Sequence, residues 1–302
     1  AQVAALTAAI ARCSPELPPI VSVDQEGGRV ARLKTGVVRI PPALVLGRRL
    51  DVETIERVGA ALGRGLAALG FSLDYAPVLD VHTNPANPVI GDRAFGTEPA
   101  PAARAALAFA SGLISAGIAA CGKHFPGHGD TTTDSHLELP RVTHARARLD
   151  EVELAPFRMA ARELPSMMSA HVVFDALDDK PATLSRRVAT ELLRGELGFE
   201  GVLVSDDLEM RAIAATYGAG EAAVLAVEAG CDALLVCSKE DAQVEAVDAL
   251  VRRAERDEAF RARCAEASAR CEKLRRDFPP RAPDLAALAV PDDVARALAE
   301  LG

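Results

Sequence analysis

The sequence is poor in aromatic residues and contains no tryptophan: Phe, Tyr and Trp together make up 4% of 302 residues. A protein that binds sugars mainly by stacking them on indole rings is therefore excluded. No apolar run reaches the roughly 20 residues that a membrane-spanning helix needs. The sequence also has no basic block of the kind that grips nucleic acid or an anionic membrane. We therefore expect no nucleic-acid partner and no membrane association.

The six cysteines are scattered, and no two of them form a CxxC motif. Cys121, Cys231 and Cys237 lie in apolar runs typical of strands. We therefore expect reduced and mostly buried thiols, which indicates a reducing compartment. Residues 1–12 predict a helix and contain neither a basic leader region nor a cleavage site, so no signal peptide is visible.

What the chain does contain is an ordinary globular composition, with 49% hydrophobic residues, 25% charged residues and a net charge of −9. This composition excludes disorder and low complexity. Acidic and basic residues are mixed along the chain. The length allows two domains, but a single α/β barrel of roughly 250 residues also fits.

Short apolar runs alternate with Ala-rich stretches of helical period. The apolar runs predict strands and cover residues 19–23, 71–79, 117–123, 166–173, 201–205 and 232–237. The helical stretches between them include residues 52–69, 102–116 and 221–229. Such alternation, with nearly unbroken apolar strands, predicts a parallel sheet covered by helices, either a barrel or a doubly wound sheet.

Polar residues follow strand after strand, and they distinguish these two folds. Asp24 follows the first predicted strand, Lys123 and His124 end the third, and Ser205-Asp206-Asp207 ends the fifth. A barrel builds its active site from the carboxyl ends of several strands, whereas a dinucleotide fold carries its signature in one Gly-rich turn. We find no such turn, so the sequence predicts an α/β fold of the (β/α)8 TIM-barrel class.

Six predicted strands are two fewer than a full barrel requires. We therefore expect this chain to lack the N-terminal strands of the barrel. The stretch from about residue 240 to residue 302 is charged, helical and too poor in apolar residues for a second core. It predicts a helical appendage on one domain that covers residues 1–302.

The most informative segment is the Gly- and Thr-rich stretch 123–136, which holds three of the six histidines. Asp134 and His136 are two positions apart, so in an extended segment their side chains project to the same side. A carboxylate beside an imidazole fixes its tautomer and raises its basicity, which suits proton transfer near neutral pH. A solvated polar loop is the alternative. A metal site is a further alternative, although the spacings of the three histidines match no standard zinc pattern.

Two glycine patterns in the sequence imitate nucleotide-binding motifs. Residues 117–123 read G-x-x-x-x-G-K, but His124 occupies the Ser/Thr position and the segment predicts a strand where the motif needs a loop. Gly59, Gly63 and Gly65 fall inside a helical pattern. Neither pattern supports nucleotide binding.

Carboxylates that leave an apolar strand are costly unless they are paired or used. One of the two carboxylates, Asp206 or Asp207, could act as a nucleophile on the anomeric carbon of a sugar. The other could equally cap the next helix, and Asp207 is our candidate for that role. Loop arginines such as Arg29, Arg32 and Arg93 fit either structural salt bridges or hydrogen bonds to substrate oxygens.

The same histidine-rich loop resembles the signature of family 3 glycoside hydrolases, and more narrowly that of the NagZ-type β-N-acetylglucosaminidases. The resemblance is carried by KHFPGHGD at 123–130 and DSH at 134–136. The segments DQEGGRV, NPVIGDR and SDD, at 24–30, 87–93 and 205–207, are similar to the other blocks of the family, in the same order. The resemblance covers residues 21–237.

The resemblance implies a single (β/α)8 barrel with two strands ahead of the first one predicted here. It implies Asp206 as the nucleophile, His136 as the general acid/base and Asp134 as the residue that orients the imidazole. The positions that it implies for binding N-acetylglucosamine at the non-reducing end are Asp24, Arg32, Arg93, Lys123 and His124.

The implied activity is retaining hydrolysis of terminal β-linked N-acetylglucosamine. The implied substrates are muropeptides, and the implied role is cytoplasmic cell-wall recycling. No cofactor and no metal are expected, the partner is a small saccharide, and the chain is expected to be a monomer or weak dimer. Two alternatives stay open: a phosphorylase, in which phosphate replaces water, and a catalytically silent sugar-binding protein. Because of its loop composition, we expect the segment with His136 to be mobile and far from Asp206 in the empty site.

Overall fold

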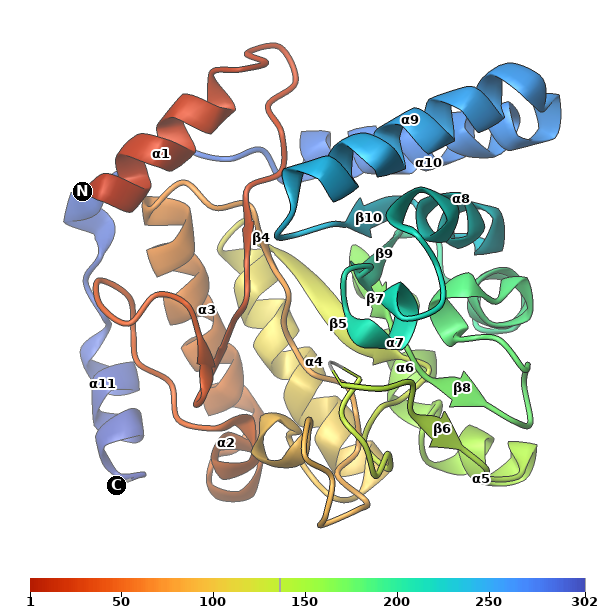
Figure 1. The fold of residues 1–302 in the computed structure, drawn as a ribbon. Helices are drawn as coiled ribbons and strands as arrows, with labels where there is room; N and C mark the ends of the chain where they lie inside the picture. Colours follow the sequence, from red (N-terminus) through yellow and green to blue (C-terminus); the bar gives the residue numbers. More distant parts are fainter. Residues whose placement is uncertain (136, 302) are drawn as a thin grey trace.

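The protein is built around one curled parallel sheet, seen in a computed structural model that describes residues 1–135 and 137–301 (Figure 1). The sheet has six strands in the order β1-β4-β5-β7-β9-β10, and every neighbouring pair is parallel. The strands are β1 (Ser22–Val23), β4 (Leu73–Asp74), β5 (Ala119–Phe125), β7 (Ser166–Ser169), β9 (Val202–Asp207) and β10 (Ala233–Leu235). Each lies within or overlaps a predicted apolar run, and β1 and β10 form the two edges.

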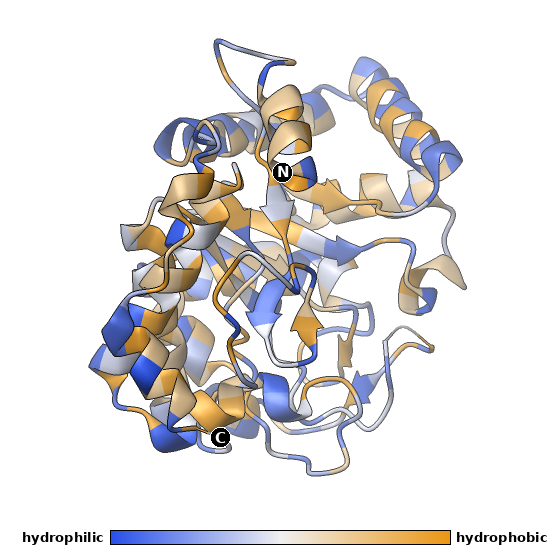
Figure 2. Cartoon of the chain, turned by 90° about the vertical axis from the view of Figure 1, so that its left-hand side faces the viewer, coloured by the Kyte–Doolittle hydropathy of each residue, from blue (hydrophilic) through white to orange (hydrophobic). Residues whose placement is uncertain are grey.

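Helices lie around the outside of the sheet, between consecutive strands (Figure 1). They are α3 (Val52–Ala68), α4 (Pro99–Ser115), α5 (Arg146–Glu151), α6 (Ala155–Ala160), the π-helix η3 (Arg187–Glu196), α7 (Arg211–Ala214) and α8 (Ala219–Ala229). Figure 2 shows apolar residues concentrated on the central strands and polar residues on the outer faces of the helices. The core therefore lies between the sheet and its helices.

Helices α3 and α4 pack closely because each has a glycine at the contact. A Cβ at Gly59 would lie 2.3 Å from the carbonyl oxygen of Phe109, and one at Gly112 would lie 2.1 Å from that of Glu56. Either position therefore excludes any side chain. Gly59, together with Gly63 and Gly65, lies inside α3, so the prediction that this glycine pattern belongs to a helix is confirmed.

Short elements connect the barrel units. The helical ones are α1 (Gln2–Ala11), α2 (Ala43–Arg49), η1 (Gly91–Arg93) and η2 (Ala182–Leu184). Strands β2 (Gln25–Gly27) and β3 (Val30–Ala31) form an antiparallel hairpin, while β6 (Arg141–Val142) pairs in parallel with β8 (Val173–Phe174). These small strands were not predicted.

The C-terminal part is helical, as predicted, and consists of α9 (Glu240–Arg256), α10 (Glu258–Asp277), η4 (Leu285–Ala287) and α11 (Asp292–Ala299). Helix α9 contacts α8 and α10, whereas α11 and η4 pack against α3 on the opposite side of the molecule (Figure 1). The Nε atom of Arg275 in α10 also donates to the carbonyl oxygen of Pro18, 3.0 Å away. The appendage therefore braces both ends of the sheet.

A buried carboxylate ties α10 to the sheet. Asp232, just before β10, accepts hydrogen bonds from Arg194 (2.5 Å), Arg263 (2.7 Å) and Arg270 (3.2 Å), and from the backbone N–H of Leu203 (3.0 Å). The Asp232 side chain is fully buried, and the three guanidinium groups are mostly buried. Together they connect η3, β9 and α10.

All six cysteines are free, but only Cys121 and Cys231 are buried. The expectation that most thiols are buried is therefore wrong. Cys237 is exposed because β10 ends at Leu235, two residues before the predicted end of that strand. Among the described residues, no helix combines the length and apolarity that a bilayer crossing needs.

Candidate active site

A cavity of about 520 Å³ lies at the carboxyl ends of the strands. Among the residues that line it are the predicted nucleophile and all five predicted saccharide-binding residues: Asp24, Arg32, Arg93, Lys123, His124 and Asp206. They come from four widely separated stretches of the sequence. The structure therefore brings together the polar residues that follow successive strands.

One wall of the cavity is the β2–β3 hairpin. Its tight turn needs glycine, because Gly27 and Gly28 have φ angles of +103° and +52°. The pairing of β2 with β3 brings Arg32 near Asp24, with 3.8 Å between the guanidinium and the carboxylate. The Arg32 side chain is 70% exposed, so it lies at the rim of the cavity.

Lys123 and Arg93 are held by carboxylates from this hairpin. The Lys123 ammonium lies 2.9 Å from Asp24 and 2.7 Å from Glu26, and it is buried. Arg93 forms a two-pronged pair with Glu26, both contacts being 2.8 Å. Burial raises the pKa of Glu26, but Lys123 and Arg93 outweigh this effect and lower it to about 2. Glu26 is therefore ionised and neutralises two buried cations.

Replacing Glu26 with Gln is expected to lower the free energy of unfolding by about 2 kcal/mol, because two buried cations would lose a shared counter-charge. Equilibrium denaturation measures this loss. The double variant Glu26→Gln/Arg93→Gln serves as the control, since it also removes one of the orphaned cations. We expect it to be less destabilised than the sum of the two single variants, and simple additivity would contradict the coupling.

Asp80 holds the start of the histidine-rich segment through contacts with His124 and His128. Its carboxylate lies 2.6 Å from Nδ1 of His124 and accepts from the backbone N–H groups of His124 and His128, at 3.2 and 2.6 Å. Burial raises the pKa of Asp80, but these two histidines lower it overall. The bond to Nδ1 leaves Nε2 of His124 facing Arg93, 3.4 Å away. Asp80 therefore sets how His124 is presented to the cavity.

Adjacent residues on a regular strand point to opposite faces, yet Lys123 and His124 both line the cavity. The pairing of β5 with β7 shifts register between Gly122 and Phe125. Such irregularities redirect side chains next to active sites. The segment Ala119–Phe125 is a strand, so the prediction that residues 117–123 form no phosphate loop is confirmed.

Asp206 lies near the end of β9 and lines the cavity. Loss of hydration raises its pKa, but His171, His124, the backbone N–H of Asp207 and Lys123 outweigh this and lower the pKa overall. The carboxylate is therefore ionised and available as a nucleophile. The His171 side chain is buried, its Nε2 lies 3.0 Å from the carbonyl oxygen of Asp207, and burial lowers its pKa.

The prediction that Asp207 caps the following helix is wrong. Asp207 still belongs to β9, and α7 begins only at Arg211 after a turn. The Asp207 carboxylate instead accepts from the backbone N–H groups of Glu209 (3.1 Å) and Cys237 (3.4 Å). It therefore organises the turn after β9 and the chain after β10.

His136 lies outside the described residues, and so does the predicted separation of the dyad from Asp206. The residue before it, Ser135, is buried and lines the cavity. The Ser135 hydroxyl lies 3.1 Å from Nε2 of His128, and its carbonyl accepts from the N–H of Ala212. Burial lowers the pKa of His128 to about 4, so this histidine is neutral.

Asp74 is a buried carboxyl group behind the cavity. Its Oδ1 accepts from the N–H of Gln25 at 2.9 Å, whereas Oδ2 has no hydrogen-bond partner among the described residues. Burial raises the pKa of Asp74 well above its usual value. Folding therefore favours the protonated form of this group.

Replacing Asp74 with Asn is expected to raise stability at neutral pH. A pKa raised by folding contributes stability below the unfolded value of about 3.9, and this contribution is lost as the pH rises through the folded value. The asparagine amide does not titrate in this range. The stability of Asp74→Asn relative to the parent chain should therefore increase from acidic toward neutral pH. Urea midpoints across this range measure it. The exposed Asp241→Asn change is the control, and an advantage that is independent of pH would contradict the argument.

Asp80 and His171 belong to the polar residues that the sequence places after successive strands, but sequence reasoning gave no role to them or to Glu26. The two-residue spacing of Asp24 and Glu26 was a signal for a shared face, but their common contact with Lys123 required the fold. Among the described residues, no group of three or more His, Cys, Asp or Glu is arranged to hold a metal ion.

Comparison with known proteins decides the family. Residues 2–272 match the family model described as the glycosyl hydrolase family 3 N-terminal domain. The chain belongs to this family. It is a glycosidase domain with the fold of a (β/α)8 barrel, as predicted, and six of the barrel strands lie in the described residues.

Relatives and solved structures of this family are similar over most of the chain. A β-hexosaminidase of Alkalilimnicola ehrlichii is 44% identical over 242 residues, covering 78% of this chain and 68% of the relative. One of Neisseria meningitidis serogroup C is 44% identical over 250 residues, covering 80% and 68%.

Two solved structures extend the comparison. A family 3 β-N-acetylglucosaminidase from Paenibacillus sp. FPU-7 has a TM-score of 0.91 and 41% identity, and the match covers 99% of this chain and 59% of that one. NagZ from Neisseria gonorrhoeae, in complex with N-trifluoroacetyl-D-glucosamine, has a TM-score of 0.81 and 34% identity, with coverage of 99% and 85%. The chain thus spans little more than half the length of the Paenibacillus enzyme.

Proposed function

We propose that this chain removes terminal β-linked N-acetylglucosamine from small saccharides by hydrolysis with retention of configuration. The observation that carries the proposal is the shared cavity: an ionised Asp206 lies with the Lys123–Asp24 and Arg93–Glu26 pairs in one space of about 520 Å³. The gonococcal relative binds an N-acylated glucosamine, which supports the sugar class.

In the proposed first step, the Asp206 carboxylate attacks the anomeric carbon and forms a glycosyl ester. The bond to the leaving oxygen breaks, and His136 donates a proton to that oxygen. His136 acts as the imidazolium in this step and leaves it as a neutral imidazole, so it never carries the negative charge with which a second carboxylate would repel Asp206. Asp134 orients the imidazole in this proposal, and the burial of Ser135 in the cavity wall supports the placement of the pair.

In the second step, His136 takes a proton from water, whose oxygen attacks the anomeric carbon and releases Asp206. Asp24, Arg32, Arg93, Lys123 and His124 are proposed to hold the hydroxyl and acetamido oxygens. Their charges are already paired within the protein, so the sugar meets a preorganised set of donors and acceptors. The proposed natural substrates are muropeptides. Cell-wall recycling, a cytoplasmic location and the monomer or weak dimer stay predictions.

The test is product analysis with para-nitrophenyl N-acetyl-β-glucosaminide in buffers with and without phosphate. We expect free N-acetylglucosamine in both buffers, released first as the β-anomer. A sugar phosphate formed only in phosphate buffer would replace the hydrolase with a phosphorylase. Binding of N-acetylglucosamine without turnover in either buffer would support a silent sugar-binding protein instead.

A further inference from the structure

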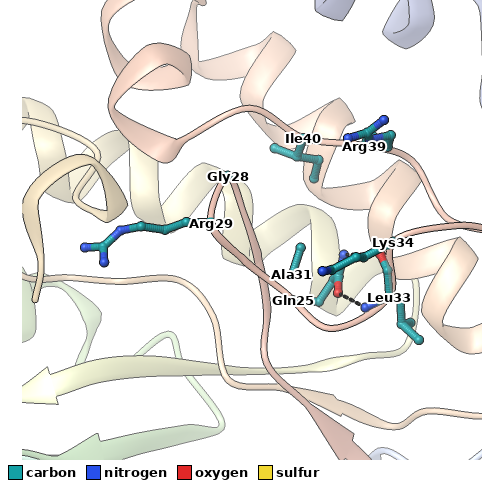
Figure 3. A pocket seen from close by; sticks show the side chains of 8 residues that line it. All are labelled: Gln25, Gly28, Arg29, Ala31, Leu33, Lys34, Arg39 and Ile40. Carbon is teal, nitrogen blue, oxygen red and sulfur yellow. Dashed lines mark hydrogen bonds between the residues drawn. The ribbon is translucent and has the colours of Figure 1, made fainter. Parts of the chain in front are cut away.

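The β2–β3 hairpin separates two cavities. Asp24, Glu26, Val30 and Arg32 line the catalytic cavity, whereas Gln25, Ala31 and Leu33 line a second one of about 360 Å³. This division follows from strand geometry, because successive side chains project to opposite faces. We call the second cavity the rear pocket (Figure 3). The further residues that line it are Gly28, Arg29, Lys34, Arg39 and Ile40.

The rear pocket has an excess of positive charge. No acidic residue lines it, and Lys34 and Arg39 have no ion pair or hydrogen bond from their side chains among the described residues. Arg29 is already engaged, because it contacts Asp92 at 3.1 Å and donates to the carbonyl oxygen of Val89 at 2.5 Å. In Figure 3 the Arg29 side chain points away from Lys34 and Arg39. Two uncompensated cations therefore remain at this pocket.

The backbone around these cations is fixed by hydrogen bonds. The Gln25 side chain bonds both backbone groups of Leu33, accepting from its N–H at 2.9 Å and donating to its carbonyl at 3.1 Å. The N–H of Gly28 donates to the carbonyl of Ile40 at 2.8 Å. These bonds hold the segment that carries Lys34 and the segment that carries Arg39 against the same hairpin. Such a frame reduces the ordering cost of binding.

We propose that the rear pocket binds a small molecule that carries one anionic oxygen group, a carboxylate or a phosphate, beside a short apolar group. Lys34 supplies a point charge and Arg39 a planar fork of donors for the anion. Ala31, Leu33 and the buried Ile40 supply the apolar surface. The site is distinct from the catalytic cavity, because it uses the opposite face of the hairpin, and it does not depend on the proposed glycosidase activity.

The test is calorimetric titration of the whole chain with two probes, inorganic phosphate and N-acetyl-L-alanine. The variant Lys34→Gln/Arg39→Gln removes both cations. The control Arg48→Gln/Arg49→Gln removes two exposed charges from the last turn of α2. Thermal unfolding of both variants should match the parent chain, since none of the four side chains makes a contact that folding requires.

We expect at least one probe to bind the parent and the control equally, and to bind the Lys34/Arg39 variant about tenfold more weakly, which is about 1.4 kcal/mol. Binding of phosphate alone assigns a phosphate ligand, and binding of N-acetyl-L-alanine alone assigns a carboxylate. The proposal is overturned if neither probe binds the parent chain. It is equally overturned if both double variants bind the probes as the parent does.

Discussion

Replacing Asp206 with alanine is expected to lower kcat by about ten-thousandfold, or about 5.4 kcal/mol of transition-state stabilisation. The reason is that the carboxylate supplies the attacking oxygen in the proposed mechanism, and its surroundings lower its pKa so that it is ionised. Hydrolysis of an activated N-acetyl-β-glucosaminide under saturating substrate measures kcat. Saccharide binding should survive, because the Lys123 and Arg93 pairs are left intact.

The adjacent carboxylate provides a matched control. Asp207→Asn keeps an oxygen that can accept from Glu209 and Cys237, so its kcat should stay within about tenfold of the parent. Azide added to the Asp206→Ala variant should restore turnover by replacing the missing nucleophile, with an inverted glycosyl azide as product. Equal losses in the two variants would remove Asp206 from its proposed role.

Replacing Asp232 with alanine is expected to destabilise the fold by about 3–5 kcal/mol, because it leaves three largely buried guanidinium groups without their common counter-charge. This is a large share of the roughly 5–15 kcal/mol by which a typical domain is stable. Burial lowers the pKa of Arg194, and Arg270 and Arg263 lower it further while Asp232 raises it. Without Asp232, Glu266 would be the remaining carboxylate that raises the pKa of Arg194, against burial and two neighbouring guanidinium groups.

Chemical denaturation of Asp232→Ala and of Asp248→Ala separates this effect from ordinary charge removal. Asp248 forms an exposed pair with Arg252 at 3.6 Å on α9, so its loss should change stability by less than about 1 kcal/mol. Asp232 is not part of the catalytic cavity, so any folded variant should keep its kcat. Coincident denaturation curves for Asp232→Ala and the parent would show that the cluster contributes nothing.

The main strands could be predicted because a strand that is buried on both faces consists of one short, continuous run of apolar residues. The run at 117–123 became β5 (Ala119–Phe125), and that at 201–205 became β9 (Val202–Asp207). Both strands continue into polar residues because the carboxyl ends carry the site. The β2–β3 hairpin was not predicted, since its strands are only three and two residues long and give no hydrophobic alternation.

The site was predictable to the extent that its residues belong to recognisable local segments. The contacts between segments were not predictable, because they join residues far apart in the sequence. Glu26 meets Arg93 only when the hairpin packs against η1, and Asp80 meets His124 only when β5 lies beside the segment after β4. The Asp207 prediction was wrong because β9 extends to Asp207 and the next helix begins only at Arg211.

Because the hairpin separates the two cavities, it matters whether an odd or an even number of residues is inserted into it or deleted from it. Deleting one residue from β2 would turn each following side chain to the other face, so the position of Glu26 in the catalytic wall would pass to a neighbour. Losing two residues would preserve the alternation and shorten the wall. Natural length variation in this segment should therefore favour even steps over odd ones.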